Sequence, residues 1–212
     1  TASIISTYRI ATQANEGDAL SVIITGSSTS STSLKLWLVS PDDGFVHPVD
    51  FAPIARVHYI NVASETLDIY KNGTIFSNDA TPGLAMPYKN IPADLPMSIA
   101  FCPAISTNPS NAYGFSAFTF ENNKTYVAVS SGVVNSALYP LTMSFWDGAQ
   151  EASTDANKTS VLFFNGSHLH PTLKIQEAGT EIFGYTDYTH FDGYKVLSDS
   201  VHTLDIVDSG NN

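Results

Sequence analysis

The chain has 212 residues, of which 43% are hydrophobic and 14% charged, and its 9 Lys plus Arg against 20 Asp plus Glu give a formal net charge of −11. A chain of this length can bury a core as one large β-domain or as two domains of roughly 100 residues. A chain this acidic lacks the basic surface that would attract nucleic acid or anionic lipid, so no nucleic-acid partner is expected.

Cysteine usage and hydropathy place few further constraints on the chain. The single cysteine, Cys102, lies in the apolar run SIAFC, which is typical of a buried small hydrophobic side chain. No apolar run approaches the ~20 residues of a membrane-spanning helix, so no membrane span is expected. No basic segment followed by an apolar one marks a signal peptide, so a secreted form of this protein would be a mature chain.

Short runs rich in Val, Ile, Phe, Tyr and Thr predict β-strands along most of the chain. In chain order these runs are 19–25, 34–39, 55–61, 67–70, 97–102, 115–120, 125–131, 141–146, 160–165, 172–176, 180–184 and 203–207. Turns rich in Gly, Asn and Asp separate them, and no long stretch keeps the apolar spacing of a helix. The pattern predicts an all-β chain of the β-sandwich type, with an open or closed barrel as the alternative.

The sequence contains an internal repeat, which begins at Ala55 and again at Thr159. The matched positions include Val57 with Val161, Tyr59 with Phe163, Asn61 with Asn165, Leu67 with Leu173, Tyr88 with Tyr194, and PMSIAFC with HTLDIVD. The first copy continues to Gly148 through FSAFTF, TYVAVSS and LTMSFW. Residues 1–44 resemble that continuation, because STYRIAT, ALSVIIT and SLKLWLVSPDDG repeat its order of strands and its Asp-Gly turn.

The repeat therefore predicts one complete module and one split module. Residues 45–148 form the complete β-sandwich, and 149–156 form a linker. The split module has its N-terminal half in 157–212 and its C-terminal half, the last strands, in 1–44. The Pro-containing connector VHPVDFAP is expected to be an extended and fairly stiff link.

The segment ARVHYINVASETLDIYKNGTIF, residues 55–76, resembles a bacterial family of domains of unknown function. Members of that family are tandem immunoglobulin-like β-sandwich modules in secreted and surface proteins. The likeness extends through NNKTYVAVSSG to about residue 148, whereas NGSHLHP departs from it in the second copy. The resemblance implies two immunoglobulin-like modules, an extracellular modular role and no known catalysis.

A split module needs its missing strands, because the half-sandwich would otherwise expose an apolar face and unpaired backbone groups. Three completions are open. Residues 1–44 complete 157–212 of the same chain, or they complete those of a neighbouring copy, or the chain is one unit of a longer array. Completion by a neighbour is preferred, since the two short connectors suit modules arranged end to end.

The expected function is that of a structural subunit of an extracellular, pilus-like filament, whose copies join head to tail by β-strand complementation. The alternative is a monomeric secreted module that binds carbohydrate or adheres to a surface. The candidate subunit-interface residues are apolar positions in the two halves of the split module. They are Ile4, Tyr8, Ile10, Leu20, Val22, Ile24, Leu36, Leu38, Leu204 and Ile206.

Four Asn-X-Ser/Thr sequons favour a glycosylated protein outside the cell. Their asparagines, which are the candidate glycosylation sites, are Asn72, Asn123, Asn157 and Asn165. The low lysine content and the GSSTSSTS tract point the same way. Covalent glycans and other copies of the chain are thus the expected partners.

No catalytic residue, cofactor or metal is expected. His168 and His170 would share one face of a strand and are the candidate metal ligands, but no third ligand follows at a matching spacing. The chain has no G-x-S-x-G elbow, no H-E-x-x-H and no Gly-rich phosphate loop. The aromatic segment FGYTDYTHFDGY, residues 183–194, is denser in aromatic side chains than a core strand needs and is a candidate sugar-stacking or intersubunit surface.

Overall fold

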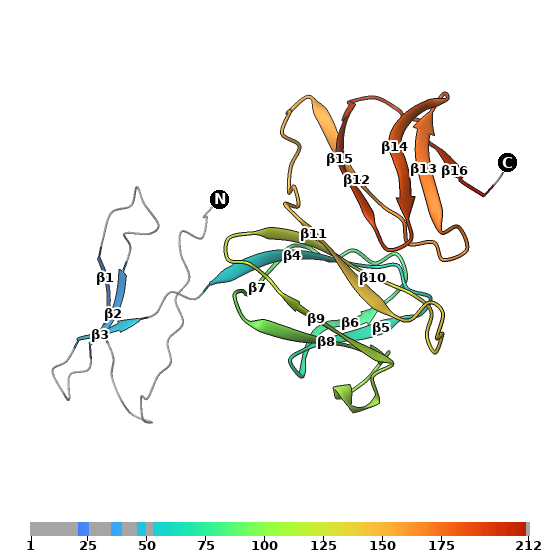
Figure 1. The fold of residues 1–212 in the computed structure, drawn as a ribbon. Helices are drawn as coiled ribbons and strands as arrows, with labels where there is room; N and C mark the ends of the chain where they lie inside the picture. The colour runs from blue at the N-terminus through green and yellow to red at the C-terminus, as the bar shows by residue number, and fades with distance from the viewer. Residues whose placement is uncertain (1–20, 26–34, 40–45, 50–52, 211–212) are drawn as a thin grey trace.

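The computed structural model describes residues 21–25, 35–39, 46–49 and 53–210, and these form strands in three groups (Figure 1). The first group is an antiparallel sheet in the order β1-β2-β3. Its strands are β1 (Ser21–Thr25), β2 (Lys35–Val39) and β3 (Val46–Val49). Apolar and β-branched residues dominate β1 and β2, as expected for strands.

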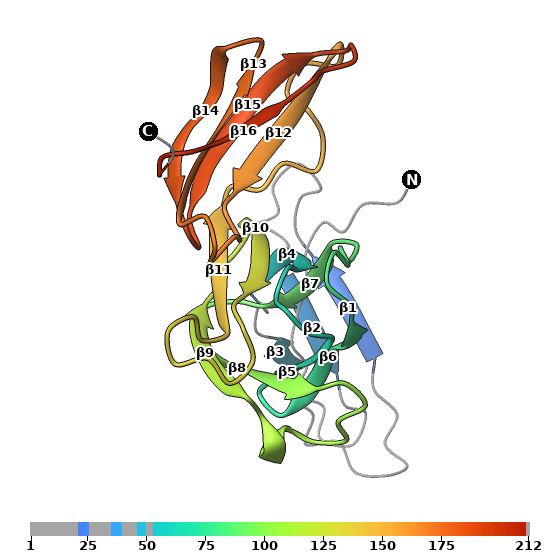
Figure 2. The same cartoon turned by 90° about the vertical axis from the view of Figure 1, so that its right-hand side faces the viewer.

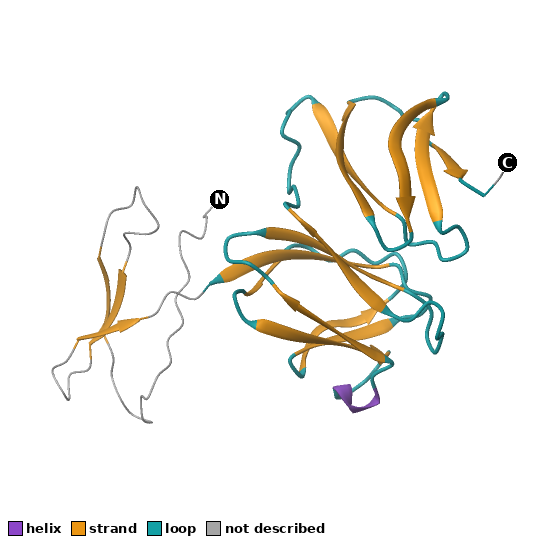
Figure 3. Ribbon diagram, viewed as in Figure 1, coloured by secondary structure: helices purple, strands orange, loops and turns teal. Residues whose placement is uncertain are grey.

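The second group is a sandwich of two four-stranded sheets, with the orders β11-β10-β4-β7 and β6-β5-β8-β9. Its strands are β4 (Ile54–Asn61), β5 (Leu67–Lys71), β6 (Thr74–Ala80), β7 (Lys89–Pro92), β8 (Pro96–Pro103), β9 (Gly114–Thr119), β10 (Thr125–Ser131) and β11 (Thr142–Asp147). All its pairings are antiparallel except that of β4 with β10, which is parallel. A single 3-10 turn, η2 (Pro109–Asn111), interrupts the strands of this group (Figure 3).

The core of this sandwich follows from alternation along its strands. In β4 the burial pattern alternates residue by residue, so that Val57 and Tyr59 face inward. They meet Phe101 of β8 and Ala128 of β10 in one cluster of buried side chains. A ring stack of Phe118 on Phe145, with centroids 3.9 Å apart, closes one side of the cluster.

The third group continues the chain beyond β11 and lies beside it (Figures 1 and 2). Two sheets with the orders β12-β15 and β14-β13-β16 make up this group. Its strands are β12 (Lys158–Phe164), β13 (Thr172–Glu177), β14 (Thr180–Asp187), β15 (Phe191–Ser198) and β16 (Asp205–Asp208). Its buried hydrophobic side chains are Leu173, Ile175 and Phe183, far fewer than in the sandwich.

The third group has the strand order of the first five strands of the sandwich. The pair β12-β15 corresponds to β4-β7, and β14-β13-β16 corresponds to β6-β5-β8. The register agrees as well, because Val161 pairs with Lys195 where Val57 pairs with Lys89. The two segments therefore share one supersecondary unit, at the level of pairing and not only of sequence pattern.

The prediction of an all-β chain is confirmed, with differences in detail. Four strands, β3, β6, β7 and β15, are not among the predicted runs. The connector that contains His47 and Pro48 was predicted to be an extended link, but its residues 46–49 form β3 and pair with β2. The sandwich accordingly begins at β4 and not at residue 45. Among the residues described, none forms a helix long and apolar enough to cross a bilayer.

Candidate docking interface

Asn61 and Asn165 anchor the two copies of the repeated unit through the same hydrogen bonds. The Asn61 side chain donates from Nδ2 to the carbonyls of Glu65 and Ala80, and its Oδ1 accepts from the amide of Ala63. The Asn165 side chain makes the equivalent three bonds, to the carbonyls of His170 and Thr186 and from the amide of Ser167. Both asparagines are buried, at 0% and 1% exposure.

Among the described residues, the third group lacks the neighbours that complete the sandwich. In the sandwich, β4 lies between β7 and β10, and β8 lies between β5 and β9. Within the part of the chain that the structure describes, β12 pairs only with β15, and β16 only with β13. Two strand edges thus present backbone donors and acceptors that their counterparts use in a sheet.

The inward face of β16 is correspondingly open. Ile206 lies opposite Ile175, as Phe101 lies opposite Ile69, and directly opposed residues of an antiparallel pair share a face. Phe101 is 0% exposed, whereas Ile206 is 70% exposed. Leu204, two residues earlier, is 42% exposed. An apolar face that the sandwich buries therefore faces solvent here.

This pairing differs by one residue from the match of PMSIAFC with HTLDIVD. That alignment sets Ile206 beside Ala100, but the register sets it in the place of Phe101. A one-residue shift exchanges the two faces of a strand. The residue at the core position is consequently Ile206 and not Val207.

The hairpin β1-β2 aligns pair by pair with β10-β11 when the pairs next to the turn are matched. Its last pair, Thr25 with Lys35, corresponds to Ser131 with Thr142. Four further pairs follow in step, up to Ser21 with Val39, which corresponds to Val127 with Trp146. The turn glycines Gly26 and Gly132 come directly after the two first strands.

Solvent exposure separates these two hairpins. All five residues of β1 are exposed, with Val22, Ile23 and Ile24 at 55%, 45% and 69%. In β10, Ala128 and Val129 are at most 2% exposed. A strand with three consecutive exposed apolar residues is a template for pairing with another chain.

The predicted interface residues fall into two sets. Val22, Ile24, Leu204 and Ile206 are exposed, Leu36 is half-buried, and Leu38 lies in β2. Ile4, Tyr8, Ile10 and Leu20 lie outside the described residues.

The aromatic segment 183–194 largely contacts the sandwich. Tyr188 meets the ring of Tyr139 edge-on with centroids 5.9 Å apart, and Phe191 meets Trp146 of β11 at 5.7 Å. The hydroxyl of Tyr194 accepts a hydrogen bond from the backbone amide of Gln150 at 3.1 Å. These contacts fix the third group against β11, so only part of the segment is available as a surface.

Tyr185 is the exposed tyrosine of this segment, at 53%. The ammonium of Lys174 lies over its ring, 5.0 Å from the centroid, in a cation–π contact. Lys174 and Tyr185 come from neighbouring strands of one sheet, so this contact staples β13 to β14.

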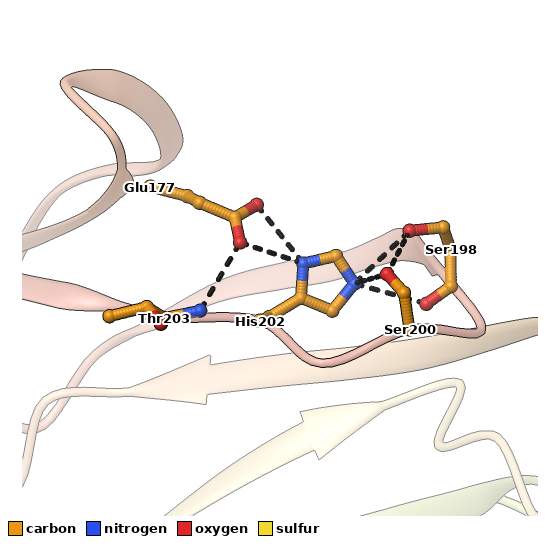
Figure 4. A network of polar contacts seen from close by, with 5 residues as sticks. All are labelled: Glu177, Ser198, Ser200, His202 and Thr203. Carbon is orange, nitrogen blue, oxygen red and sulfur yellow. Dashed lines mark hydrogen bonds and ion pairs between the residues drawn. The ribbon is translucent and has the colours of Figure 1, made fainter.

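A network of polar side chains surrounds His202, between β15 and β16 (Figure 4). The Nδ1 atom lies 3.0 Å from both carboxylate oxygens of Glu177, and Nε2 lies 3.0 Å from the Ser198 carbonyl. The Glu177 carboxylate also accepts from the amide of Thr203. Glu177 and the Ser198 carbonyl together raise the pKa of His202 above 6.5, and the hydrogen bond from His202 lowers the pKa of Glu177 below 4.5.

This network has the order carboxylate, imidazole, hydroxyl, because the hydroxyls of Ser198 and Ser200 lie 3.2 and 3.3 Å from Nε2. Carbonyl and carboxylate oxygens only accept hydrogen bonds, so a protonated His202 donates from Nδ1 to Glu177 and from Nε2 to the Ser198 carbonyl. In that form the ring has no lone pair with which to take a proton from serine. The arrangement acts as a clamp that joins the β15–β16 connection to the end of β13.

The two predicted metal ligands contact different residues. His168 and His170 occupy the bend before β13 and do not share a face of a strand. His168 packs on the ring of Tyr139, and His170 Nδ1 lies 2.6 Å from the Asp208 carboxylate. Within the described residues no group of three or more His, Cys, Asp or Glu side chains is placed to hold a metal.

The predicted glycosylation sites differ in accessibility. Asn72, Asn123 and Asn157 are exposed at turns or strand ends. Asn165 was expected to be a glycan acceptor, but it is buried and its Nδ2 donates to two backbone carbonyls. A glycan on that nitrogen would break the anchor, so the folded chain excludes Asn165 as an acceptor.

The fold defines an all-β protein with two copies of one supersecondary unit. No protein-family model matches the chain, and a comparison with curated proteins finds no similar sequence. The resemblance of residues 55–76 to a family of immunoglobulin-like modules stays a prediction.

Proposed function

We propose that this protein is a structural subunit of an extracellular filament, in which copies join head to tail by β-strand complementation. One observation carries the proposal. The exposed hairpin β1-β2 aligns pair by pair with β10-β11, and within the described residues β12–β16 has the strand order of β4–β8 without the neighbours β9 and β10 that complete the sandwich. The chain thus carries a donor hairpin and an acceptor half-sandwich for the same fold.

Complementation uses surfaces that are unfavourable when left open. The free edge of β12 and the apolar side chains of Leu204 and Ile206 face solvent, as do those of β1. An added strand supplies main-chain hydrogen bonds along the edge, and its alternate side chains fill the open face. Because donor and acceptor are different surfaces of one chain, each added copy leaves one of each free and the assembly extends linearly.

The contacts between the sandwich and the third group support a structural role. Trp146 and Phe191 pack across it, and Ser144 Oγ donates to the Thr189 carbonyl at 2.9 Å. The linker that follows is tied back by Arg56, whose guanidinium makes a bidentate ion pair with Glu151 at 2.6 and 2.7 Å. A filament subunit needs its acceptor held in a fixed orientation to its body.

An extracellular location is part of the proposal. The asparagines of three sequons, Asn72, Asn123 and Asn157, are exposed and therefore accessible for glycan attachment. A carbohydrate-binding role, the alternative function, receives less support. Of its four candidate stacking residues, Tyr188, Phe191 and Tyr194 contact the sandwich or its linker instead. The fourth, Tyr185, is exposed, and the Lys174 ammonium lies over its ring.

Removal of residues 1–44 tests the proposal. The truncated chain keeps the sandwich and the acceptor but lacks the donor, so it should remain monomeric in light scattering. A peptide of residues 1–44 should bind it, whereas the peptide should not bind a chain that carries Ile206→Asp. Filament formation by the truncated chain would contradict the proposal.

A further inference from the structure

The acceptor edge has a template in the sandwich, where β4 pairs with β10 in parallel. Tyr59 is the register partner of Ala128, and Asn61 is that of Ser130. By the equivalence of β4 with β12 and of β10 with β1, Val22 would stand beside Phe163 and Ile24 beside Asn165.

The template pair contains a chain of buried hydrogen bonds. The hydroxyls of Tyr59 and Ser130 lie 2.8 Å apart, and the Ser130 hydroxyl donates to Asn61 Oδ1, also at 2.8 Å. All three residues are 0% exposed. A buried hydroxyl needs such a partner, because leaving it unpaired costs free energy.

The acceptor strand β12 and the donor strand β1 each lack one of the two hydroxyls. Phe163 replaces Tyr59 and has no hydroxyl, and Ile24 replaces Ser130 and has none either. The loss of both partners is nearly neutral, whereas the loss of one leaves the other unpaired. β1 is therefore matched to β12, and it would strand the Tyr59 hydroxyl if it took the place of β10.

We infer that β1 of one copy docks beside β12 of a second copy as a parallel strand, in a single register that sets Val22 beside Phe163 and Ile24 beside Asn165. The inference rests on the proposed function and names the strand, the direction and the residue pairs of that same contact. The apolar pair Phe163–Ile24 makes the site selective, because the polar pair Tyr59–Ser130 of the sandwich does not fit it.

Disulfide formation between two single-cysteine variants tests the register. Ser21 and Leu162 become register partners on the outward face, at a Cα separation within reach of a disulfide. Mixed S21C and L162C chains should give a cross-linked dimer, several-fold more than mixed S21C and S160C chains, in which the cysteines are two residues out of step. The native Cys102 is buried and stays out of the reaction.

The outcomes separate the register from the function. A higher yield of cross-linked dimer with S160C than with L162C would overturn the register but not the contact between two copies. A cross-link that forms within one chain carrying both S21C and L162C, but not between the mixed variants, would overturn the second copy as partner and the filament with it. A monomeric mixture without any cross-link would overturn both.

Hydrogen exchange of the unmodified protein provides a measurement that needs no variant. Amides of β12 should exchange more slowly as the protein concentration rises, and those of β1 should do so in parallel. Unchanged exchange in β12 alongside protection in β16 would place the donor at the other edge and overturn the register.

Discussion

Asn61 and Asn165 make the same three side-chain hydrogen bonds in two different parts of the chain. The loops that they anchor also agree, since the amides of Asn61 and Asn165 donate to the carbonyls of Leu84 and His190. The two anchors differ in one hydrogen bond, because Asn61 Oδ1 also accepts from the hydroxyl of Ser130 on β10. In the proposed assembly, β1 of a second copy takes the place that β10 has beside β4.

Replacement of Asn165 by Ala should destabilise the third group. The carbonyls of His170 and Thr186 and the amide of Ser167 would lose a partner in a buried site. The expected loss is about 2–4 kcal/mol in the free energy of unfolding. Denaturant titration measures it, with the exposed Asn157→Ala as control, and equal stabilities for the two variants would refute the anchor.

The apolar pair at the docking site predicts coupling between two substitutions. Phe163→Tyr should weaken assembly by roughly 1–3 kcal/mol, because it buries a hydroxyl beside Ile24 without a partner. Adding Ile24→Ser to the partner should recover at least ~1 kcal/mol, since the serine restores the pair seen in the sandwich. The midpoint of assembly in light scattering measures each step of the cycle.

The control for this cycle is Ile23→Ser, on the opposite face of β1. It should lower assembly without any coupling to Phe163→Tyr. Equal coupling for positions 23 and 24 would show that Ile24 does not face Phe163.

A glycine at the joint should be more sensitive to substitution than a nearby one. Gly193 has a φ of +68°, and an added Cβ would lie 3.3 Å from Trp146. Gly193→Ala should therefore destabilise the chain by ~1–2 kcal/mol. Gly184→Ala meets only ordinary contacts, at 3.6 Å and beyond, and should cost less. Thermal unfolding compares them, and a larger loss for Gly184→Ala would contradict the packing at the joint.

The His202–Glu177 clamp should make stability depend on pH. The folded chain raises the pKa of His202 above 6.5, so its contribution is complete below that value and is lost as the pH rises through the raised pKa. The lowered pKa of Glu177 has the opposite effect, with a contribution complete above 4.5 and lost as the pH falls. The clamp should stabilise most between about pH 5 and 6.5.

Thermal unfolding of the His202→Asn variant across pH checks this window. The difference in Tm from the unmodified chain should be largest near pH 6 and shrink toward pH 8.5 and toward pH 3.5. His190→Asn is the control, because His190 contacts a backbone carbonyl and no carboxylate. A Tm difference for His202→Asn that does not change with pH would show that the ion pair with Glu177 does not stabilise the fold.

The sequence allowed prediction of strands with a strong apolar pattern but not of those fixed by pairing. Residues 55–61 and 125–131 carry β-branched and aromatic residues and form β4 and β10. β7 and β3 each contain a proline, which depresses any strand prediction. Their backbone is extended because neighbouring strands β4 and β2 bind them.

The candidate site was only partly predictable for a similar reason. The match of Asn61 with Asn165 was visible in the repeat, but Asn165 also opens a sequon, and the sequence does not show which role applies. Burial decides it in the fold. The contacts of Tyr188 and Tyr194 with residues of the 139–150 region are equally absent from local pattern, since they join segments that only the fold brings together.

Electron microscopy of the purified chain, over a range of protein concentrations, shows whether copies assemble into filaments. Unbranched fibres should lengthen with concentration, with the edge of each β12 filled by β1 of the next copy. Uniform single-chain particles at every concentration would contradict it.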